Sequence, residues 1–494
     1  MQRREDRKNL LFSKRIFSGV GLRGLQVLLF CGVVLYVLSY AIIPFSDGDP
    51  AYYAIVGRGL LRDHALPYQY AFDHKPLGAY LFYGVWDRIV PFYPGKFTLL
   101  AGLLIGVFVA LGRTFGSFSR ITAFTLFSVC GALFDVLSGN TELVVVTGEA
   151  VCLAALLRGI ETDASALFFL AGWVAAFTVS INYLAAVCLV GPVALMLLSP
   201  GWFRPSRCML AGLGVLAGFG VLFAPYGFAG HGALQAYFSM QFEFLRHYGV
   251  AVSERIPGAL RMVFYGVLMA PVLVAWVRRF PPGLRQEATR RTLILPVWFL
   301  SSFPATLLSG HAFDHYFTLC FAPVVLMLAI LWKEGARPST LSLMPLLGLS
   351  LVCVGLETKK NFNIARDMAH VDYAKVARLV GDAPVLNIRT YHAVFYRSDL
   401  KPFDVYLFST HIDILFGEHA WMRYMQDLRQ HPRFVIAPYA GCARHVVEAP
   451  VCQWLQDHYE QVYAVNIPHR HTSGPNKFSF SLYRFREQKD DDGS

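Results

Sequence analysis

Long apolar segments recur along most of the chain and constrain its fold more than any other feature. A stretch of about 18 or more apolar residues with few charges is long enough to cross a bilayer as a helix. Hydrophobic residues make up 55% of the 494-residue chain and charged residues 16%. Soluble proteins contain about 25% charged residues. The composition therefore makes a soluble enzyme with one large core a poor alternative.

These segments predict a polytopic α-helical membrane protein with about eleven spans. In chain order, the expected spans cover residues 25–44, 97–111, 121–137, 143–158, 166–181, 184–198, 209–225, 259–277, 292–309, 317–332 and 341–356.

The distribution of Lys and Arg predicts how the spans are oriented. Basic residues dominate alternate loops, which are 113–120, 201–207, 278–291 and 333–340. Under the positive-inside rule these loops are cytoplasmic, together with the basic N-terminal tail, which has no small-residue cleavage site. The loops 45–95, 226–257 and 309–316 then lie outside. Because the net charge of +11 falls largely in short loops, we expect membrane lipids as partners and no nucleic acid.

The polar C-terminal part predicts a second domain. We divide the chain into a multi-span domain, 1–356, and a soluble periplasmic α/β domain, 357–494. Strand-like runs alternate with a helical stretch at 421–430; these runs are 383–388, 433–439, 461–467 and 478–485. Cys442 and Cys452 are the two cysteines of this domain. A disulfide is compatible with an oxidising compartment, and two unpaired thiols are the alternative.

The first outside loop begins with FSDGDPAYY, at residues 45–53. One interpretation is structural: Asp49 caps a helix, Pro50 is its first residue, and the helix lies along the membrane surface. That interpretation does not explain YAFDHKPLGAY, at 70–80, which places Asp73, His74 and Lys75 just before the next apolar residues. Ionisable groups at this depth are costly and usually functional.

The whole loop resembles the first outside loop of the GT-C superfamily of polyprenyl-phosphate-sugar-dependent glycosyltransferases, of the protein O-mannosyltransferase and lipid A aminoarabinose transferase type. That family's pattern is roughly D-E-x-x-Y-A-x-x-A-R, then P-Y, then D-x-K-P-P-L. The matching residues are Asp49, Tyr53, Ala54, Arg58, Pro67, Tyr68, Asp73, Lys75, Pro76 and Leu77. The chain departs at Pro50 and Gly57 and lacks the second proline after Lys75.

Weaker matches at GNTE (139–142) and HAFDHYFTLCFAP (311–323) extend the resemblance over most of the chain. The resemblance implies a bacterial inner-membrane enzyme that is active on the periplasmic face. It would transfer a sugar, with inversion, from polyprenyl (undecaprenyl) phosphate to an envelope lipid, glycan or protein. We expect no cofactor and leave a divalent metal open.

The chemistry fits these residue types. A phosphate leaves as a stable anion, so one carboxylate that activates the acceptor suffices, and cations must hold the phosphate. The resemblance makes Asp49 the general base. Asp47 is the second candidate, as an acid or as the helix cap. Lys75 is the first phosphate-binding candidate, followed by Arg58 and by Arg255 in the second outside loop.

The remaining candidates for substrate contacts are Tyr53, Asp73, His74, Glu142, His315 and Tyr316. Glu142 has an alternative role in pairing with a cation. His311 and His315 have the spacing of a metal chelate on a helix, but we favour cavity contacts and expect no metal there. Two other functions stay open. A transporter or flippase predicts ionisable residues in mid-span and repeated halves. A non-catalytic assembly subunit would keep the fold without activity.

Overall fold

The structure is a computed structural model that describes residues 48–89, 120–249, 252–280, 287–468 and 476–486, apart from 309, 312 and 337. It also describes most of 24–40, and these residues are helical. Asp47 and the expected second span, 97–111, lie outside the described residues.

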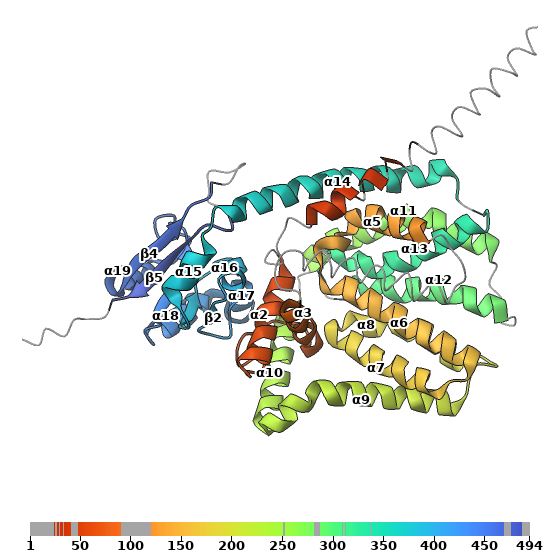
Figure 1. The fold of residues 1–494 in the computed structure, drawn as a ribbon, viewed down its shortest axis with the longest axis horizontal. Coiled ribbons are helices and arrows are strands. Elements are labelled where there is room, and N and C mark those ends of the chain that lie inside the picture. The colour runs from red at the N-terminus through yellow and green to blue at the C-terminus, as the bar shows by residue number, and fades with distance from the viewer. Residues whose placement is uncertain are drawn as a thin grey trace, which may run out of the picture.

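A body of packed helices forms the larger part of the molecule (Figure 1). A helix lies on every expected span from the third to the eleventh. These helices are α5 (Arg120–Gly131), α6 (Thr141–Thr162), α7 (Ser165–Ile181), α8 (Leu184–Leu198), α9 (Pro205–Ala229), α11 (Val252–Arg279), α12 (Glu287–Ala305), α13 (Thr318–Lys333) and α14 (Thr340–Ala369). Among the described residues, five helices are long and apolar enough to cross a membrane. The total number of crossings stays a prediction.

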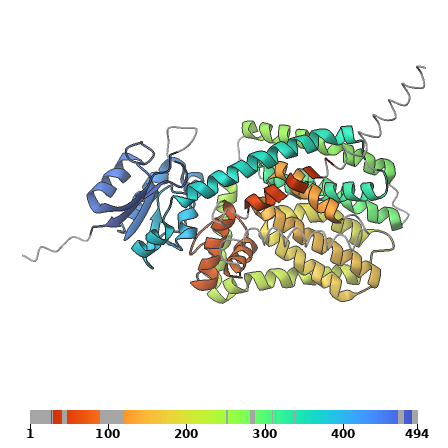
Figure 2. The ribbon, with the colours of Figure 1, turned by 45° about the horizontal axis from the view of Figure 1, so that its top comes forward.

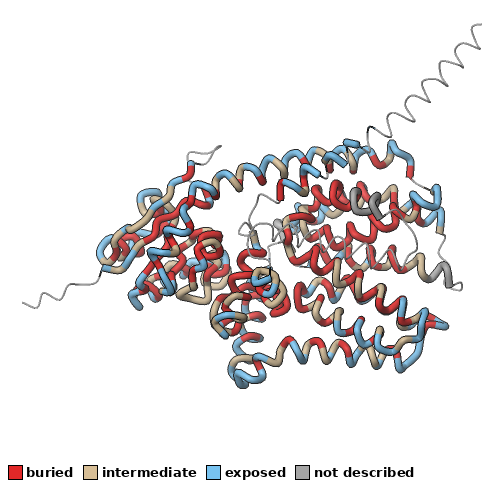
Figure 3. The backbone as a smooth tube through the Cα atoms, in the orientation of Figure 1, coloured by how far each residue is buried: buried red, intermediate tan, exposed pale blue. Residues whose placement is uncertain are grey.

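The surface of this helical body exposes large apolar side chains, which would be unfavourable in contact with water. Large hydrophobic side chains such as Leu216 and Val221 on α9 and Val267 on α11 are exposed, and pale blue runs along the outer side of α9 in Figure 3. Lipid tails are as apolar as leucine, so such side chains cost little when they face a bilayer. The exposed pattern agrees with a multi-pass membrane protein.

Three shorter helices sit at the end of the body that faces the C-terminal domain (Figure 1). They are α2 (Asp49–Arg62), α3 (Leu77–Ile89) and α10 (His231–His247). At the crossing of α2 and α3, a Cβ added to Gly57 would lie 2.5 Å from the Gly84 Cα and even closer to the Tyr80 carbonyl oxygen. The helices therefore touch through their backbones, which explains a glycine at position 57.

Two local expectations for α2 are wrong. Gly48 is the N-cap residue, and Asp49 is already helical, a one-residue difference at a helix end. The Tyr52 and Tyr53 side chains are 2% exposed, so they do not lie at a membrane interface. They are enclosed by α3 and the C-terminal domain, through rings such as Tyr83 and Phe408.

The C-terminal part folds around a five-stranded mixed sheet in the order β2-β1-β3-β5-β4. Its strands are β1 (Pro384–Asn387), β2 (Lys401–Pro402), β3 (Phe434–Pro438), β4 (Tyr459–Val465) and β5 (Phe480–Phe485). β1 is parallel to β2 and β3, and β5 is antiparallel to β3 and β4. Each of the four strand-like runs forms one strand, whereas the two-residue β2 was not predicted.

Five helices accompany this sheet: α15 (Tyr373–Val380), α16 (Ala393–Arg397), α17 (Ser409–Phe416), α18 (Ala420–Leu428) and α19 (Ala449–His458). Cys442 and Cys452 form a disulfide with their Cα atoms 5.5 Å apart. Figure 2 shows α14 reaching from the helical body to the sheet. The expected division at residue 356 falls inside this continuous helix, and its place relative to a membrane stays a prediction.

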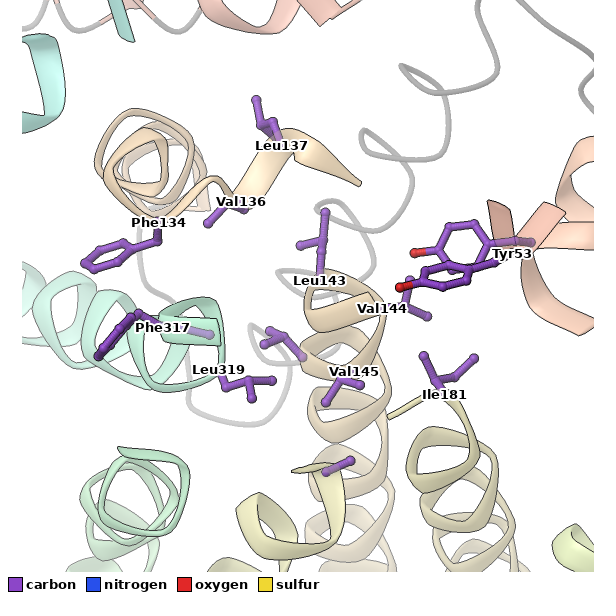
Figure 4. Close-up of a cluster of buried hydrophobic side chains, with 14 of the residues drawn as sticks. Tyr53, Phe134, Val136, Leu137, Leu143, Val144, Val145, Ile181, Phe317 and Leu319 are labelled. Atoms are coloured by element: carbon purple, nitrogen blue, oxygen red, sulfur yellow. The ribbon is translucent and has the colours of Figure 1, made fainter. Parts of the chain in front are cut away.

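Part of the hydrophobic core lies beside the junction of the helical body and the C-terminal domain. Figure 4 shows Leu143, Val144 and Val145 at the start of α6, between Tyr53 on one side and Phe134 and Phe317 on the other. All are buried in one cluster, which the short 3₁₀ turns η1 (Ala132–Phe134) and η3 (Asp314–Phe317) complete. This core fixes α2 against α6 and the start of α13.

Candidate active site

A cavity of about 490 Å³ lies where the helical body, the first outside loop and the C-terminal domain meet. Its walls include residues 48–53 and 73–75 of the first outside loop, the turn at 135–140, residues 313–316, α14 and the C-terminal domain. Concave sites between domains are the usual places for ligand binding.

The Asp49 carboxylate is exposed at one wall of this cavity. Its side chain has one long contact in the described structure: the Tyr53 hydroxyl donates to Oδ2 over 3.5 Å. The backbone before it is held firmly, because the Gly48 N–H donates to the Tyr391 hydroxyl over 2.8 Å and the Gly48 carbonyl lies 3.0 Å from His392 Nε2. Asp49 can therefore meet a ligand while its backbone stays fixed.

Asp73 forms a buried cluster with two histidines. Its Oδ1 lies 2.7 Å from His74 Nδ1 and 3.0 Å from His411 Nε2. Burial alone would raise the pKa of the Asp73 carboxyl, but His74 and His411 outweigh it and hold that pKa well below its usual value. Burial also lowers the pKa of His74, against the opposing charge of Asp73. Asp73 is thus an anion.

His411 has oxygen acceptors at both ring nitrogens. Nδ1 lies 3.1 Å from the Phe72 carbonyl oxygen, and Nε2 faces Asp73. Satisfying both requires either an imidazolium or a cation on the Asp73 side. Ligand atoms of Asp73, His74 and His411 lie within 4.8 Å of one another, and two histidines with one carboxylate suit zinc or iron. These three residues are the group that fits a divalent metal in the described part of the chain.

Lys75 lies in the same wall, and 7% of its surface is exposed. Its ammonium is 6.0 Å from the centre of the Tyr316 ring. Within the described residues it makes no ion pair. A desolvated cation beside an aromatic ring attracts an anion strongly, so Lys75 can bind a phosphate.

The segment 311–316 divides between the cavity and the helical body. His315 and Tyr316 line the cavity. Asp314 instead accepts a hydrogen bond from Tyr265 over 2.9 Å, and His311 Nε2 lies 3.1 Å from the Tyr248 carbonyl oxygen. The expected cavity contact is therefore found for His315 and not for His311.

Three expected ligands are not brought to the cavity. Arg58 binds Asp87 over 2.6 Å and Asp399 over 3.2 Å, so its charge is already neutralised at the far end of α2. Arg255 is exposed on α11, which extends further into the second outside loop than expected. Glu142 is buried and accepts from Asn182 Nδ2 over 2.9 Å, behind the cavity wall.

Several residues of the cavity were not predicted. They include Asp135, Asn140, Lys360, Tyr391, Thr410, His411 and Lys477. Asp135 lies near the end of the expected third span in a left-handed conformation, with φ of 49°, and a carboxylate within an apolar segment is a signal that could have found it. The residues from the C-terminal domain have no comparable signal.

Searches with protein-family models and against curated proteins find no match to the chain. Solved structures do match. ArnT from Cupriavidus metallidurans bound to undecaprenyl phosphate has a TM-score of 0.57 and 12% identity, covering 93% of this chain and 97% of that chain. The same protein in the apo state has a TM-score of 0.48 and 12% identity, covering 94% and 98%. The Archaeoglobus fulgidus oligosaccharyltransferase in complex with Zn and sulfate has a TM-score of 0.44 and 11% identity, covering 91% and 73%.

The likeness to undecaprenyl-phosphate-bound ArnT extends over nearly the whole of both chains. At this identity it concerns the fold alone. It includes both the helical body and the C-terminal sheet, and it was expected from the first outside loop. The chain therefore has the GT-C fold of ArnT.

Proposed function

We propose that the protein is an integral membrane glycosyltransferase that moves a sugar from undecaprenyl phosphate, or a similar polyprenyl phosphate, to an envelope acceptor. The observation that carries this proposal is one cavity with an exposed carboxylate, Asp49, and a buried cation, Lys75. The fold supports it, because the ArnT structure of the same fold is bound to undecaprenyl phosphate.

The reaction needs two groups of opposite charge. Asp49 takes the proton from a hydroxyl or amine of the acceptor as the acceptor atom bonds to the anomeric carbon of the sugar. The bond from that carbon to the phosphate oxygen breaks, and its electron pair leaves with the polyprenyl phosphate. Lys75 stabilises the charge that develops on this phosphate. In-line attack inverts the anomeric configuration.

The surroundings of the two groups suit this division of roles. Asp49 belongs to the first turn of α2 and is exposed at the cavity. The leaving phosphate requires no protonation, so the reaction needs no second carboxyl group as general acid beside Asp49. The basic loops on the opposite side favour a periplasmic active face, and the polyprenyl chain would lie between membrane helices. The acceptor would be an envelope lipid, glycan or protein.

The test compares envelope lipids, glycans and glycoproteins by mass spectrometry in four strains. A deletion strain is complemented with the wild type, with Asp49→Asn, with Asp63→Asn, or with nothing, and protein levels are checked by immunoblot. Asp63 ends the same helix but pairs with Arg62 and Lys401 outside the cavity, so it is the matched control.

We expect one sugar mass to be absent from the deletion and Asp49→Asn strains and present with Asp63→Asn. That mass would identify the donor sugar. A wild-type profile with Asp49→Asn at normal protein level would contradict the proposal and favour a transporter or a non-catalytic subunit.

A further inference from the structure

Two neighbouring residues of the C-terminal domain form hydrogen bonds to the backbone directly before Asp49. The Tyr391 hydroxyl accepts the Gly48 N–H over 2.8 Å, and His392 Nε2 lies 3.0 Å from the Gly48 carbonyl oxygen. The backbone N–H and carbonyl groups of Gly48 therefore both find hydrogen-bond partners in the C-terminal domain. Gly48 has φ of 98°, a conformation that other residues adopt only with strain.

The Tyr391 and His392 side chains are themselves held by packing. His392 is 1% exposed, and its ring packs on Tyr52 and Phe408 with centroid distances of 5.7 and 5.6 Å. The Lys477 ammonium lies 4.4 Å from the centre of the Tyr391 ring. Side chains held in this way can fix the groups they bind.

The same domain also fastens the second functional segment of the first loop. The Phe72 N–H donates to the Val405 carbonyl oxygen over 2.7 Å. His411 contacts both the Phe72 carbonyl oxygen and the Asp73 carboxylate. Lys75 follows two residues later. The segments that contain the proposed base and the proposed phosphate ligand are therefore both tied to one unit of structure, 343 residues away from Gly48 along the chain.

We propose that Tyr391 and His392 are positioning residues that orient Asp49, so that the C-terminal domain is part of the catalytic unit and not an accessory to it. This inference rests on the proposed function. Asp49 has no short side-chain hydrogen bond in the described structure, so its direction depends on the peptide that Tyr391 and His392 hold. A displacement of about 1 Å in such a group can cost roughly 100-fold in rate.

The experiment uses the full-length protein in lipid nanodiscs. Tyr391→Phe removes only the hydroxyl, and His392→Leu removes the ring donor, whereas His392→Gln keeps an N–H donor. Tyr463→Phe is the matched control, because the Tyr463 hydroxyl accepts the Asp372 N–H over 3.2 Å in the same domain, away from the cavity. Amide hydrogen exchange of residues 48–56, binding of undecaprenyl phosphate, and kcat and KM of sugar transfer are measured.

We expect Tyr391→Phe and His392→Leu to speed exchange at residues 48–56 and to lower kcat roughly 10- to 100-fold, with unchanged affinity for undecaprenyl phosphate. His392→Gln should recover part of the loss, and Tyr463→Phe should behave as the wild type. An unchanged kcat, or an affinity for undecaprenyl phosphate that falls in step with kcat, would overturn the positioning role.

The exchange measurement separates this proposal from the proposed function. If the wild type transfers no sugar, the function fails and exchange alone decides whether Tyr391 and His392 order the segment. If the wild type is active and exchange is unaffected in both variants, the positioning role fails while the function stands.

Discussion

Gly57→Ala tests whether the backbone contact between α2 and α3 sets the site. The new Cβ would lie 2.5 Å from the Gly84 Cα, whereas ordinary van der Waals contact begins at 3.4 Å. The neighbouring atoms are backbone, including the Tyr80 carbonyl oxygen, so no side chain can rotate away. The two helices would have to separate by about 0.9 Å.

The magnitude follows from two opposing effects. Overpacking costs about 1–3 kcal/mol, and replacing glycine by alanine within a helix returns up to about 1 kcal/mol. A net loss of about 2 kcal/mol lowers the melting temperature by about 2–4 °C in a chain of this length. Asp49 lies eight residues, or about 12 Å, along the same helix. A shift of α2 by nearly an ångström should therefore lower transfer as well, by up to about 100-fold.

The assay is thermal unfolding of purified protein in detergent together with transfer activity. Gly232→Ala on α10 is the matched control, since a Cβ there meets nothing within 4 Å, and it should be neutral or slightly stabilising. A Gly57→Ala variant that melts and transfers like the wild type would refute the argument that helix contact at this glycine sets the position of Asp49.

Three further predictions follow from the structure. Arg58→Ala leaves the Asp87 carboxylate without its cation and with the Tyr396 hydroxyl as its remaining donor in the described structure, so it should lower the free energy of unfolding by about 2–3 kcal/mol, without weakening undecaprenyl phosphate binding in a direct titration. Burial and the nearby Asp404 raise the pKa of Asp427 from its usual 3.8 to about 7. The folded state then holds this proton more tightly than the unfolded state, so its stabilising effect is lost as pH rises from about 4 to about 7. Asp427→Asn should remove that loss, of up to about 4 kcal/mol, from melting temperatures measured across this range. Zinc should bind to Asp73, His74 and His411. A chelator should therefore lower the melting temperature of the wild type but not of His411→Gln. Elemental analysis should show the metal in the wild type alone.

The first outside loop could be predicted from sequence because its chemistry is local. Asp49, Tyr53 and Lys75 lie within 27 consecutive residues, and the two short helices α2 and α3 pack directly on each other. The apolar segments were equally predictable, since each helix of the body is apolar over its own length. The strands of the sheet were visible as runs of β-branched and aromatic residues.

The other half of the cavity could not be predicted in this way. His411 and Tyr391 contact the first outside loop over more than 300 residues of sequence, and Lys477 lies against Tyr391. Each looks like an ordinary polar residue of a soluble domain. Arg58 shows the converse failure. Its place in the loop pattern indicated a phosphate ligand, but Arg58 pairs with Asp87 and Asp399 instead. Nothing in the sequence indicates these two partners.

The position of Arg58 gives the loop pattern a physical interpretation. At the N-terminal end of α2, Tyr391 and His392 hold Gly48. At the other end, Arg58 and Arg62 bind Asp399 of the same domain. The C-terminal domain thus holds both ends of α2, which is about 20 Å long. Under the proposed function, Asp49 is the chemical group of the pattern, and we infer that Arg58 keeps the helix that presents it in place. On this argument, losing Arg58 should lower turnover only as far as it lets α2 move, whereas losing Asp49 should abolish turnover in a protein that is still folded.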